Sequence, residues 1–523
     1  MTPAPPAPAR SEESASAEPD PAESGPAKSG PVEPAIEPDT DLEELDPEAA
    51  QAKAEAEAKA AAEKQRICAL LQADQRYQAG DLAAAEQLYR AAKAPFARSL
   101  GAGELSPAKA AIADPEALSP GGRVFLREAA AGQAQNLETR TLVPLELLVQ
   151  QHPEFIPGHI QFSEALVAAG RSEEGLAVLA AATRDYPNQP DLLRAQIALA
   201  AEQKQWMDAA MVARRFAQLN PDHPEAAAFV ALAEENMALY QRDLRDRLRT
   251  NTLANVLTGA ISVALTGNIW NSLPAVQTTA MMLRGEAGVG QGLSKSIQRQ
   301  IEMVEDEEIV TYINELGQRL AQVAGRDEFE YEFHVVMDDT LNAFALPGGK
   351  VFVNAGAIAK TQSEAELAGL LSHELAHAVL SHGFRLVSDG SLLSDLSRFI
   401  PYGGYASNLV VLNYSRTMER EADELGARIL ASAGYAADGL HGLMQTLGEG
   451  NSRRPLFAWM STHPETDERI GNLEAQISRE GLNRYQFEGV ERHHRMRVKT
   501  QRLINDWKER QAKEKAERPW WRR

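Results

Sequence analysis

Residues 364–383 read EAELAGLLSHELAHAVLSHG. Alanine and leucine dominate this stretch and favour a helix, on which residues four positions apart share a face. His373 and His377 therefore present two imidazoles on one side, about 6 Å apart along the axis. Two imidazoles so arranged can hold one tetrahedral zinc ion, and Glu374 beside them can take a proton from water at the metal. The alternative is a buried helix with incidental histidines.

A catalytic zinc ion needs a third protein ligand and an open fourth position. Residues 414–423 read YSRTMEREAD and predict a second helix, on which Glu419 and Asp423 are four residues apart. One of these carboxylates can reach the metal while the other accepts the remaining ring proton of a ligating histidine. Asp423 suits this second role.

HELAH and YSRTMEREAD together resemble the HExxH plus ExxAD pattern of the gluzincin zinc metallopeptidases of the HtpX, BepA and CAAX prenyl endoprotease type. The resemblance spans about residues 297–481, roughly a third of the chain. It implies one zinc ion per chain, with Glu419 as the third ligand beside the two histidines. Glu421 is the wrong glutamate by spacing, and we expect it to face away from the metal.

Further roles follow from the same resemblance. His463 matches the histidine of a His-Pro motif that approaches the metal, where it donates to the oxyanion or caps the zinc ion in a resting form. Without the resemblance it would be a surface histidine. Arg469 matches a basic residue of that motif and is either a substrate contact or a structural one. His382 lies five residues after His377, away from the ligand face, and we interpret it, like His334, as structural.

Two stretches near the metal motif are rich in β-forming residues. FEYEFHVVMDD and GGKVFVNAG lie around a turn at Pro347–Gly349 and predict strands. A substrate chain that lies extended beside such an edge gains main-chain hydrogen bonds without demanding a particular sequence. The alternative is that the strands only build the core. The family resemblance also covers this region, and we expect the substrate-binding edge at Asn342, Ala343, Phe344, Ala345 and Leu346.

Residues 65–247 carry apolar residues at helical spacing and a 34-residue period. A helix-turn-helix unit of this length is typical of tetratricopeptide repeats, whose concave face binds peptides or partner proteins. The alternative is a generic helical bundle. The period is marked by three prolines, Pro153, Pro187 and Pro221.

The turns inside these repeats are also predicted by the period. Gly170 falls at the turn between two helices, and Lys204 is its equivalent one repeat later. A hairpin at 75–92 has the same turn chemistry, so we include it in the repeat domain.

Composition limits the class of protein. A chain of 523 residues with 44% hydrophobic and 24% charged residues is expected to form two or more folded units. The single cysteine, Cys68, excludes a disulfide framework and a cysteine-based zinc finger. The net charge of −21 disfavours nucleic acid as the main partner, because that binding depends on phosphate neutralisation by Lys and Arg.

The two ends of the chain differ from its body. Residues 1–45 are rich in proline and acidic residues and predict a disordered tail, followed by a charged helix at 46–64. Residues 486–523 predict a basic C-terminal tail that is a solvated helix, with contact to an anionic surface as the alternative. The opening residues contain no apolar signal segment. We therefore expect a cytoplasmic location, or a membrane-associated or periplasmic one if the true start lies upstream.

Residues 248–290 predict an amphipathic connector. Its segment 250–283 contains no charged residue, and its apolar residues step by three and four. We expect this face to pack against the neighbouring domain. Peripheral contact with an anionic membrane is the alternative, because four arginines precede the segment.

These observations predict a multidomain, mainly α-helical chain. It contains tetratricopeptide-like helical repeats and, at residues 291–485, an α+β gluzincin metalloprotease domain with a small sheet. The resemblance implies a zinc-dependent metalloendopeptidase that cleaves protein or peptide substrates in protein quality control, with repeats that dock substrates or partner proteins. The alternative is a chaperone or scaffold-type binding protein with a latent metal site.

Overall fold

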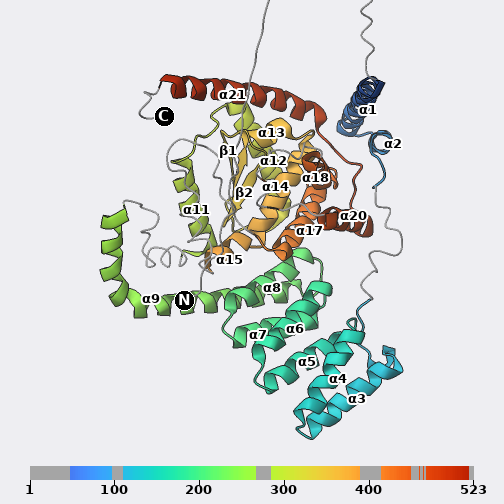
Figure 1. Ribbon diagram of the computed structural model, residues 1–523, viewed down its shortest axis with the longest axis vertical. Coiled ribbons are helices and arrows are strands. Elements are labelled where there is room, and N and C mark those ends of the chain that lie inside the picture. Colours follow the sequence, from blue (N-terminus) through green and yellow to red (C-terminus); the bar gives the residue numbers. More distant parts are fainter. Residues whose placement is uncertain are drawn as a thin grey trace, which may run out of the picture. The chain divides into compact units, whose positions relative to one another are not determined.

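The computed structural model describes residues 47–96, 110–266, 284–388, 414–448, 459, 463 and 467–517. This part of the chain is mainly α-helical and contains one small three-stranded sheet (Figure 1). The described residues divide into two units, one that ends at residue 60 and one that begins at residue 61. The predicted fold class, mainly α with a small sheet, is confirmed. The predicted tail at 1–45 lies outside the described residues.

Helical hairpins follow one another between residues 110 and 266. The prolines of the 34-residue period lie between α4 and α5, between α6 and α7, and between α8 and α9, where a proline cannot interrupt a helix. In chain order the elements are η1 (Pro115–Ala117), α3 (Pro120–Ala134), α4 (Glu138–Gln151), α5 (Ile156–Ala168), α6 (Ser172–Asp185), α7 (Pro190–Glu202), α8 (Trp206–Leu219) and α9 (Ala226–Thr266).

The turns within these hairpins share one backbone conformation. Asn136, Gly170 and Lys204 follow α3, α5 and α7, with φ angles of 53°, 76° and 61°. These residues are also 34 positions apart. A left-handed residue reverses the chain after a helix and costs least at glycine or asparagine, so the lysine is the strained member of the series.

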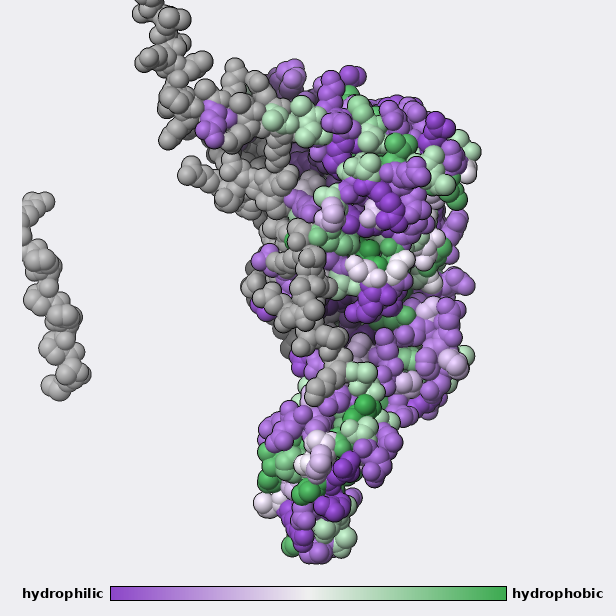
Figure 2. All heavy atoms as spheres, turned by 90° about the vertical axis from the view of Figure 1, so that its right-hand side faces the viewer, coloured by the Kyte–Doolittle hydropathy of each residue, from purple (hydrophilic) through white to green (hydrophobic). Residues whose placement is uncertain are grey.

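On the face drawn in Figure 2, hydrophilic residues predominate and the hydrophobic ones are scattered.

The elements from residue 285 onward build a second region, in which helix α14 is buried. They are α11 (Gly285–Gln298), α12 (Glu307–Ala324), β1 (Glu332–Val336), β2 (Ala343–Leu346), β3 (Lys350–Asn354), α13 (Ala355–Lys360), α14 (Glu364–Val379), α15 (His382–Ser388), α17 (Arg416–Ser432), α18 (Gly439–Gly448), α20 (Asp467–Glu480) and α21 (Val490–Glu517).

The sheet has the strand order β1-β3-β2, so β2 is an edge strand. β1 pairs with β3 in parallel, and β2 pairs with β3 as an antiparallel hairpin in which Leu346 lies opposite Lys350. The turn between them contains Gly348 and Gly349, whose φ angles of 73° and 80° are accessible to glycine at little cost.

Helix α14 packs against α12, α17, α18 and the strands β2 and β3. Two glycines allow this close approach. A side chain at Gly369 would meet the backbone nitrogen of Leu440 at 2.5 Å, and one at Gly426 would meet the backbone of His373 at 3.2 Å. Glycine at these two positions therefore allows α14 to pack closely against α17 and α18.

Helix α8 belongs to the hairpins but also packs into the core around α14. Met207 and Met211 lie in one hydrophobic cluster with Phe344 and Phe384, and Leu219 joins the cluster that contains the apolar residues of α14. The helical repeats and the α14 region therefore share buried surface.

The first hairpin, α1 (Pro47–Gln78) and α2 (Leu82–Ala92), has a different neighbour from the one predicted. The sequence predicts it as part of the repeat domain at 65–247, but its buried residues from Leu70 onward cluster with Val490. Asp74 explains this position, because it accepts hydrogen bonds from the backbone N–H groups of Glu488 and Val490 at 2.9 and 2.8 Å. The predicted boundary between residues 64 and 65 falls inside α1.

Helix α21 corrects the prediction of a solvated basic tail at 486–523. One face of its first half is buried, including Met496 and Ile504, because its few apolar residues recur at helical spacing.

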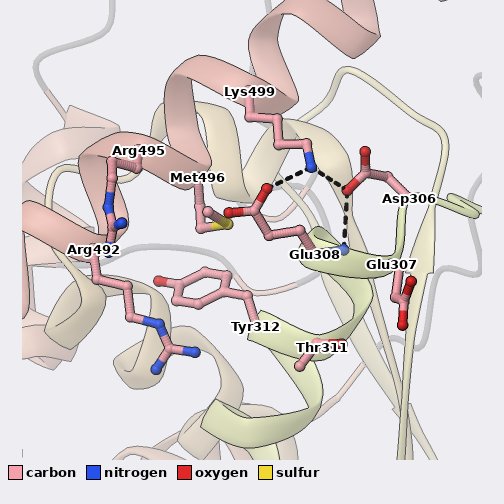
Figure 3. Close-up of a pocket in the computed structure, with 9 residues that line it drawn as sticks. All are labelled: Asp306, Glu307, Glu308, Thr311, Tyr312, Arg492, Arg495, Met496 and Lys499. Atoms are coloured by element: carbon pink, nitrogen blue, oxygen red, sulfur yellow. Dashed lines mark hydrogen bonds and ion pairs between the residues drawn. The ribbon is translucent and has the colours of Figure 1, made fainter.

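A cavity of about 500 Å³ lies between α12 and α21 (Figure 3). Lys499 at its wall pairs with Asp306 at 2.7 Å and with Glu308 at 2.6 Å.

Of the predicted connector at 248–290, residues 267–283 lie outside the described residues. Helix α9 extends to Thr266, and described side chains resume at Arg284. Among the helices that the structure describes, none has both the length and the apolar character needed to span a bilayer.

The buried carboxylate of Asp74 generates a stability prediction. Asp74 is 4% exposed and also accepts the hydroxyl of Tyr89 at 2.6 Å. Asp74→Ala leaves three buried donors without their acceptor, so the free energy of unfolding should fall by about 1–3 kcal/mol, measured by denaturant titration. The control is Glu86→Ala, which breaks an exposed pair with Arg90 and should change it by about 0.5 kcal/mol or less. Equal effects of the two variants would contradict the role of Asp74.

Candidate metal centre

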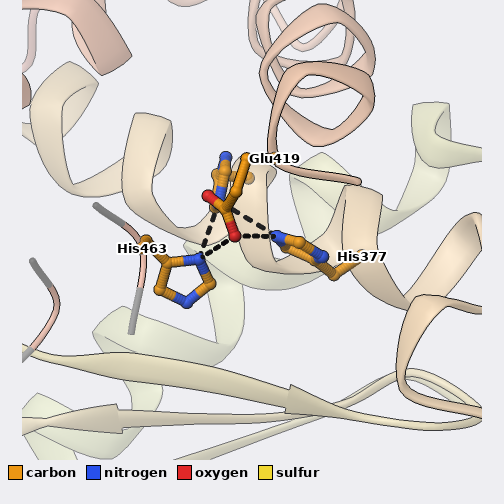
Figure 4. Close-up of side chains that lie close together, drawn as sticks. His377, Glu419 and His463 are labelled. Atoms are coloured by element: carbon orange, nitrogen blue, oxygen red, sulfur yellow. Dashed lines mark hydrogen bonds and ion pairs between the residues drawn. The ribbon is translucent and has the colours of Figure 1, made fainter. Parts of the chain in front are cut away.

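Four side chains bring their donor atoms within 4.8 Å of one another: His373, His377, Glu419 and His463. We call them the four-donor group. All four residues are buried, and two of them are fully buried. Figure 4 shows the labelled side chains of His377, Glu419 and His463 pointing toward one another. The structure thus brings together the three predicted metal ligands and the predicted loop histidine.

Local sequence places three members of the group. Ser363 caps α14 by accepting the backbone N–H of Glu366 at 3.2 Å, and the helix then carries both histidines on one face. Ser415 caps α17 in the same way, accepting Met418 N–H at 3.2 Å. Glu419 therefore lies in the first turn of α17, where the helix dipole favours a carboxylate.

The spacing of the donor atoms fits a tetrahedral zinc ion. Two ligands at zinc–nitrogen distances of about 2.1 Å lie about 3.4 Å apart when the geometry is tetrahedral. The Nε2 atoms of His373 and His377 are 3.1 Å apart, and His463 Nδ1 is 3.3 Å from His373 Nε2. Glu419 Oε1 lies 2.8 Å from His463 Nδ1 and 3.6 Å from His377 Nε2. Three imidazoles and one carboxylate are also a donor set that zinc accepts.

The electrostatics of the group favour a cation. Burial disfavours charge on His373, but Asp423 and Glu419 outweigh it and raise the pKa of His373 to about 9. Burial and the neighbouring His373 hold the pKa of His377 well below its usual value. Burial also disfavours the Glu419 carboxylate, yet His463 and His373 hold its pKa well below the usual range. The carboxylates therefore create a site that favours added positive charge.

Asp423 and Arg469 contact members of the four-donor group and hold them in position. Asp423 Oδ1 lies 3.0 Å from His373 Nδ1, the position predicted for an acceptor that fixes the ring. Arg469 donates two hydrogen bonds of 2.7 Å to Asp423, and its Nη1 lies 3.0 Å from Glu419 Oε2. Of its two predicted roles, the geometry corresponds to the structural contact.

Glu374 lies beside the group in a fully buried position. Its Oε1 accepts the indole N–H of Trp459 at 3.0 Å and lies 3.5 Å from His463 Nε2. Its Oε2 has no hydrogen-bond partner among the described residues. A buried carboxylate oxygen without a donor is costly, so this atom is available to a water or substrate proton.

The predicted substrate edge coincides with β2 and the residue before it. Asn342 is 1% exposed, and neither its side-chain oxygen nor its nitrogen has a partner among the described residues. Phe344 stacks on Phe352 with ring centroids 5.0 Å apart, so this strand also builds the core. The backbone N–H of Trp459 donates to Leu341 O at 3.3 Å, just before the edge strand.

Three residues at the site were not predicted to be there. Trp459 lies four residues before His463 but belongs to none of the motifs that predict the site. Tyr414 stacks on His377 with ring centroids 3.8 Å apart. His382, interpreted from its spacing as a structural residue away from the ligand face, is not a member of the four-donor group, but its Nδ1 lies 2.9 Å from His377 Nδ1, a contact that the spacing did not predict. Ser381, at φ 58°, ends the helical spacing on which that interpretation rested. His334 lies on β1, and its Nε2 is 3.0 Å from Glu332 Oε2.

A helix that carries two histidines and a glutamate, beside a second helix whose carboxylate lies near both histidines, is the arrangement typical of zinc metallopeptidases. Residues 309–477 match the family model Peptidase family M48. The chain therefore contains a peptidase family M48 domain.

The chain is also similar to named proteases. The chain is 33% identical over 195 residues to mitochondrial metalloendopeptidase OMA1 of Schizosaccharomyces pombe, covering 33% of this chain and 56% of that protein. It is 29% identical over 225 residues to a putative beta-barrel assembly-enhancing protease of Vibrio cholerae, covering 38% and 46%. It is 24% identical over 258 residues to the beta-barrel assembly-enhancing protease of Escherichia coli, covering 44% and 52%. The chain thus spans about half the length of these relatives.

The four-donor group generates a prediction on metal content. The purified protein should contain one zinc ion per chain, and His373→Ala, His377→Ala and Glu419→Ala should lose it, because too few ligands remain for tight tetrahedral binding. Elemental analysis after dialysis measures this, with His334→Ala as the control that keeps its zinc. Zinc retained in Glu419→Ala but lost in Glu421→Ala would show that the other glutamate is the ligand.

Proposed function

We propose that this chain is a zinc-dependent metalloendopeptidase that hydrolyses peptide bonds of protein substrates. The observation that carries the proposal is the buried four-donor group with the carboxylate of Glu374 beside it. The M48 domain supports it, as do the names of the relatives, which are metalloendopeptidases and proteases.

In the proposed reaction the ligands are His373, His377 and Glu419. When bound, zinc supplies Lewis-acid polarisation of the scissile carbonyl and of the attacking water. Glu374 takes a proton from that water on its unpartnered oxygen and later delivers it to the leaving amine. Asp423 holds the ring of His373 so that its Nε2 stays directed at the metal.

We assign the arrangement of His463 and Trp459 to a resting form. Four protein donors fill a tetrahedral zinc site, whereas hydrolysis needs one open position. His463 therefore withdraws when substrate enters, and Trp459 releases Glu374. A withdrawn His463 can donate to the oxyanion, a contribution of about 3 kcal/mol for one well-aimed donor.

The proposed substrate lies extended along Asn342–Leu346. A substrate N–H can take the place of Trp459 N–H at Leu341 O, and the Asn342 amide offers two further buried polar atoms. Backbone pairing of this kind accepts many sequences, which suits protein quality control. A role in quality control is also favoured by relatives named for β-barrel assembly. Because β-barrels assemble in membranes, these names favour the membrane-associated or periplasmic alternative for location.

Glu374→Gln tests the proposed chemistry. The variant should keep its zinc and its melting temperature but lose casein cleavage by about a hundredfold or more, since an amide cannot accept the proton. Wild-type protein treated with a chelator is the matched control and should be equally inactive. If wild-type protein that holds stoichiometric zinc cleaves no protein substrate, the chaperone or scaffold alternative is the better one.

Removal of α3 and α4, residues 110–152, tests docking by the helical hairpins. We expect kcat/KM for a folded protein substrate to fall about tenfold or more, while kcat/KM for a short unstructured peptide stays within about twofold, because docking raises only the effective concentration of a large substrate. Zinc content and melting temperature of the truncated protein are the controls. Equal losses for the two substrates would contradict docking.

A further inference from the structure

A line of polar contacts leads from the metal ligand His377 to helix α8. His377 Nδ1 lies 2.9 Å from His382 Nδ1, and His382 Nε2 lies 3.1 Å from Glu421 Oε2. Arg215 Nη1 on α8 donates to the other carboxylate oxygen, Glu421 Oε1, at 3.0 Å. The line thus joins α14, α15, α17 and α8.

The protons along this line can be assigned in one direction only. A neutral imidazole that presents Nε2 to a metal carries its proton on Nδ1, so His377 donates to His382 Nδ1. His382 then carries its own proton on Nε2 and donates it to Glu421. The guanidinium of Arg215 has no acceptor capacity and completes the line as a donor. Every contact in it therefore has one donor and one acceptor.

The same pattern supports the other histidine ligand. His373 is followed by Asp423 and then Arg469, all within the M48 domain. His377 is followed by His382, Glu421 and then an arginine of the helical hairpins. Each line of contacts therefore reaches a carboxylate that an arginine holds. In the line from His373 that arginine belongs to the M48 domain, whereas in the line from His377 it belongs to helix α8.

Helix α8 is fixed at this point rather than loosely attached. Arg214, next to Arg215, donates to Ser381 Oγ at 3.0 Å, directly before His382. Ser381 in turn donates to Glu286 at 2.7 Å. The side chains of Arg215 and Glu421 are only 15% and 16% exposed, so their ion pair is sheltered, unlike the exposed pairs that contribute little.

We propose that His382, Glu421 and Arg215 are positioning residues for the metal ligand His377, so that helix α8 of the repeat hairpins helps to set the zinc affinity of the M48 domain. The inference rests on the proposed function in that it takes His377 to be a zinc ligand. It gives the hairpins a role at the metal that is separate from any docking of substrate.

Zinc affinity of the full-length protein, measured by competition with a chromophoric chelator, tests this line. Partners of metal ligands typically contribute 10–100-fold to affinity, so His382→Ala and Glu421→Ala should raise the zinc Kd by about tenfold or more. Arg215→Ala should raise it less, and Arg215→Lys should recover part of the loss, because lysine keeps a charged donor. The double variant Arg215→Ala/Glu421→Ala should match Glu421→Ala alone, since Arg215 acts through Glu421.

The visible spectrum of the cobalt-substituted protein gives a readout independent of activity. The d–d bands should shift in Glu421→Ala because the ring of His377 loses its orientation. If that variant fails to fold, Glu421→Gln replaces it; its amide oxygen still accepts from His382, so a smaller shift and a smaller rise in Kd are expected.

Arg428→Ala is the matched control. Arg428 also lies on α17 and also reaches α8, donating to Leu219 O at 2.8 Å, but its line of contacts does not lead to a metal ligand. It should leave the zinc Kd and the cobalt spectrum unchanged. Unchanged zinc binding in Glu421→Ala, or an equal loss in Arg428→Ala and Arg215→Ala, overturns the inference. Wild-type protein that binds no zinc overturns the proposed function instead.

Discussion

The burial of three ionisable side chains on helix α14 is the constraint on which the rest of the structure depends. His373, Glu374 and His377 are all fully buried, and a buried polar group is costly unless a partner satisfies it. Their partners come from separate parts of the chain: α17 supplies Glu419 and Asp423, α15 supplies His382, and Trp459 and His463 come from another segment. Packing around α14 is therefore also the assembly of the site.

Periodicity explains what could be predicted from the sequence. The i, i+4 spacing of His373 and His377 and of Glu419 and Asp423 determines which side chains share a helix face, and the structure brings all four together. The 34-residue period likewise predicts the turns at Gly170 and Lys204, and it would have predicted Asn136. A period gives no information where the backbone departs from the helix, as at Ser381, so helical spacing does not predict the contact of His382 with His377.

Contacts between segments that are far apart in the sequence could not be predicted from periodicity. Trp459, the docking of α21 and the position of the first hairpin depend on residues far apart in the chain, such as Asp74 with Val490. Local patterns identify elements and their apolar faces, but several partners can cover the same face. Helix α8 illustrates this: its spacing predicts a repeat helix, yet Met207 and Met211 pack beside the edge strand and Arg215 reaches Glu421.

Within the proposed function, the resting form couples two events: the withdrawal of His463 from the metal position and the release of Glu374 by Trp459. His463 N–H donates to Trp459 O at 2.8 Å, so the residue that fills the fourth metal position and the residue that holds Glu374 are tied by backbone. The same Trp459 also donates from its own backbone to Leu341 O, beside the substrate edge. A substrate chain that pairs with this edge competes with Trp459 for one acceptor. Its binding would then displace both residues together, so the general base and the open metal position become available only when a substrate is in place.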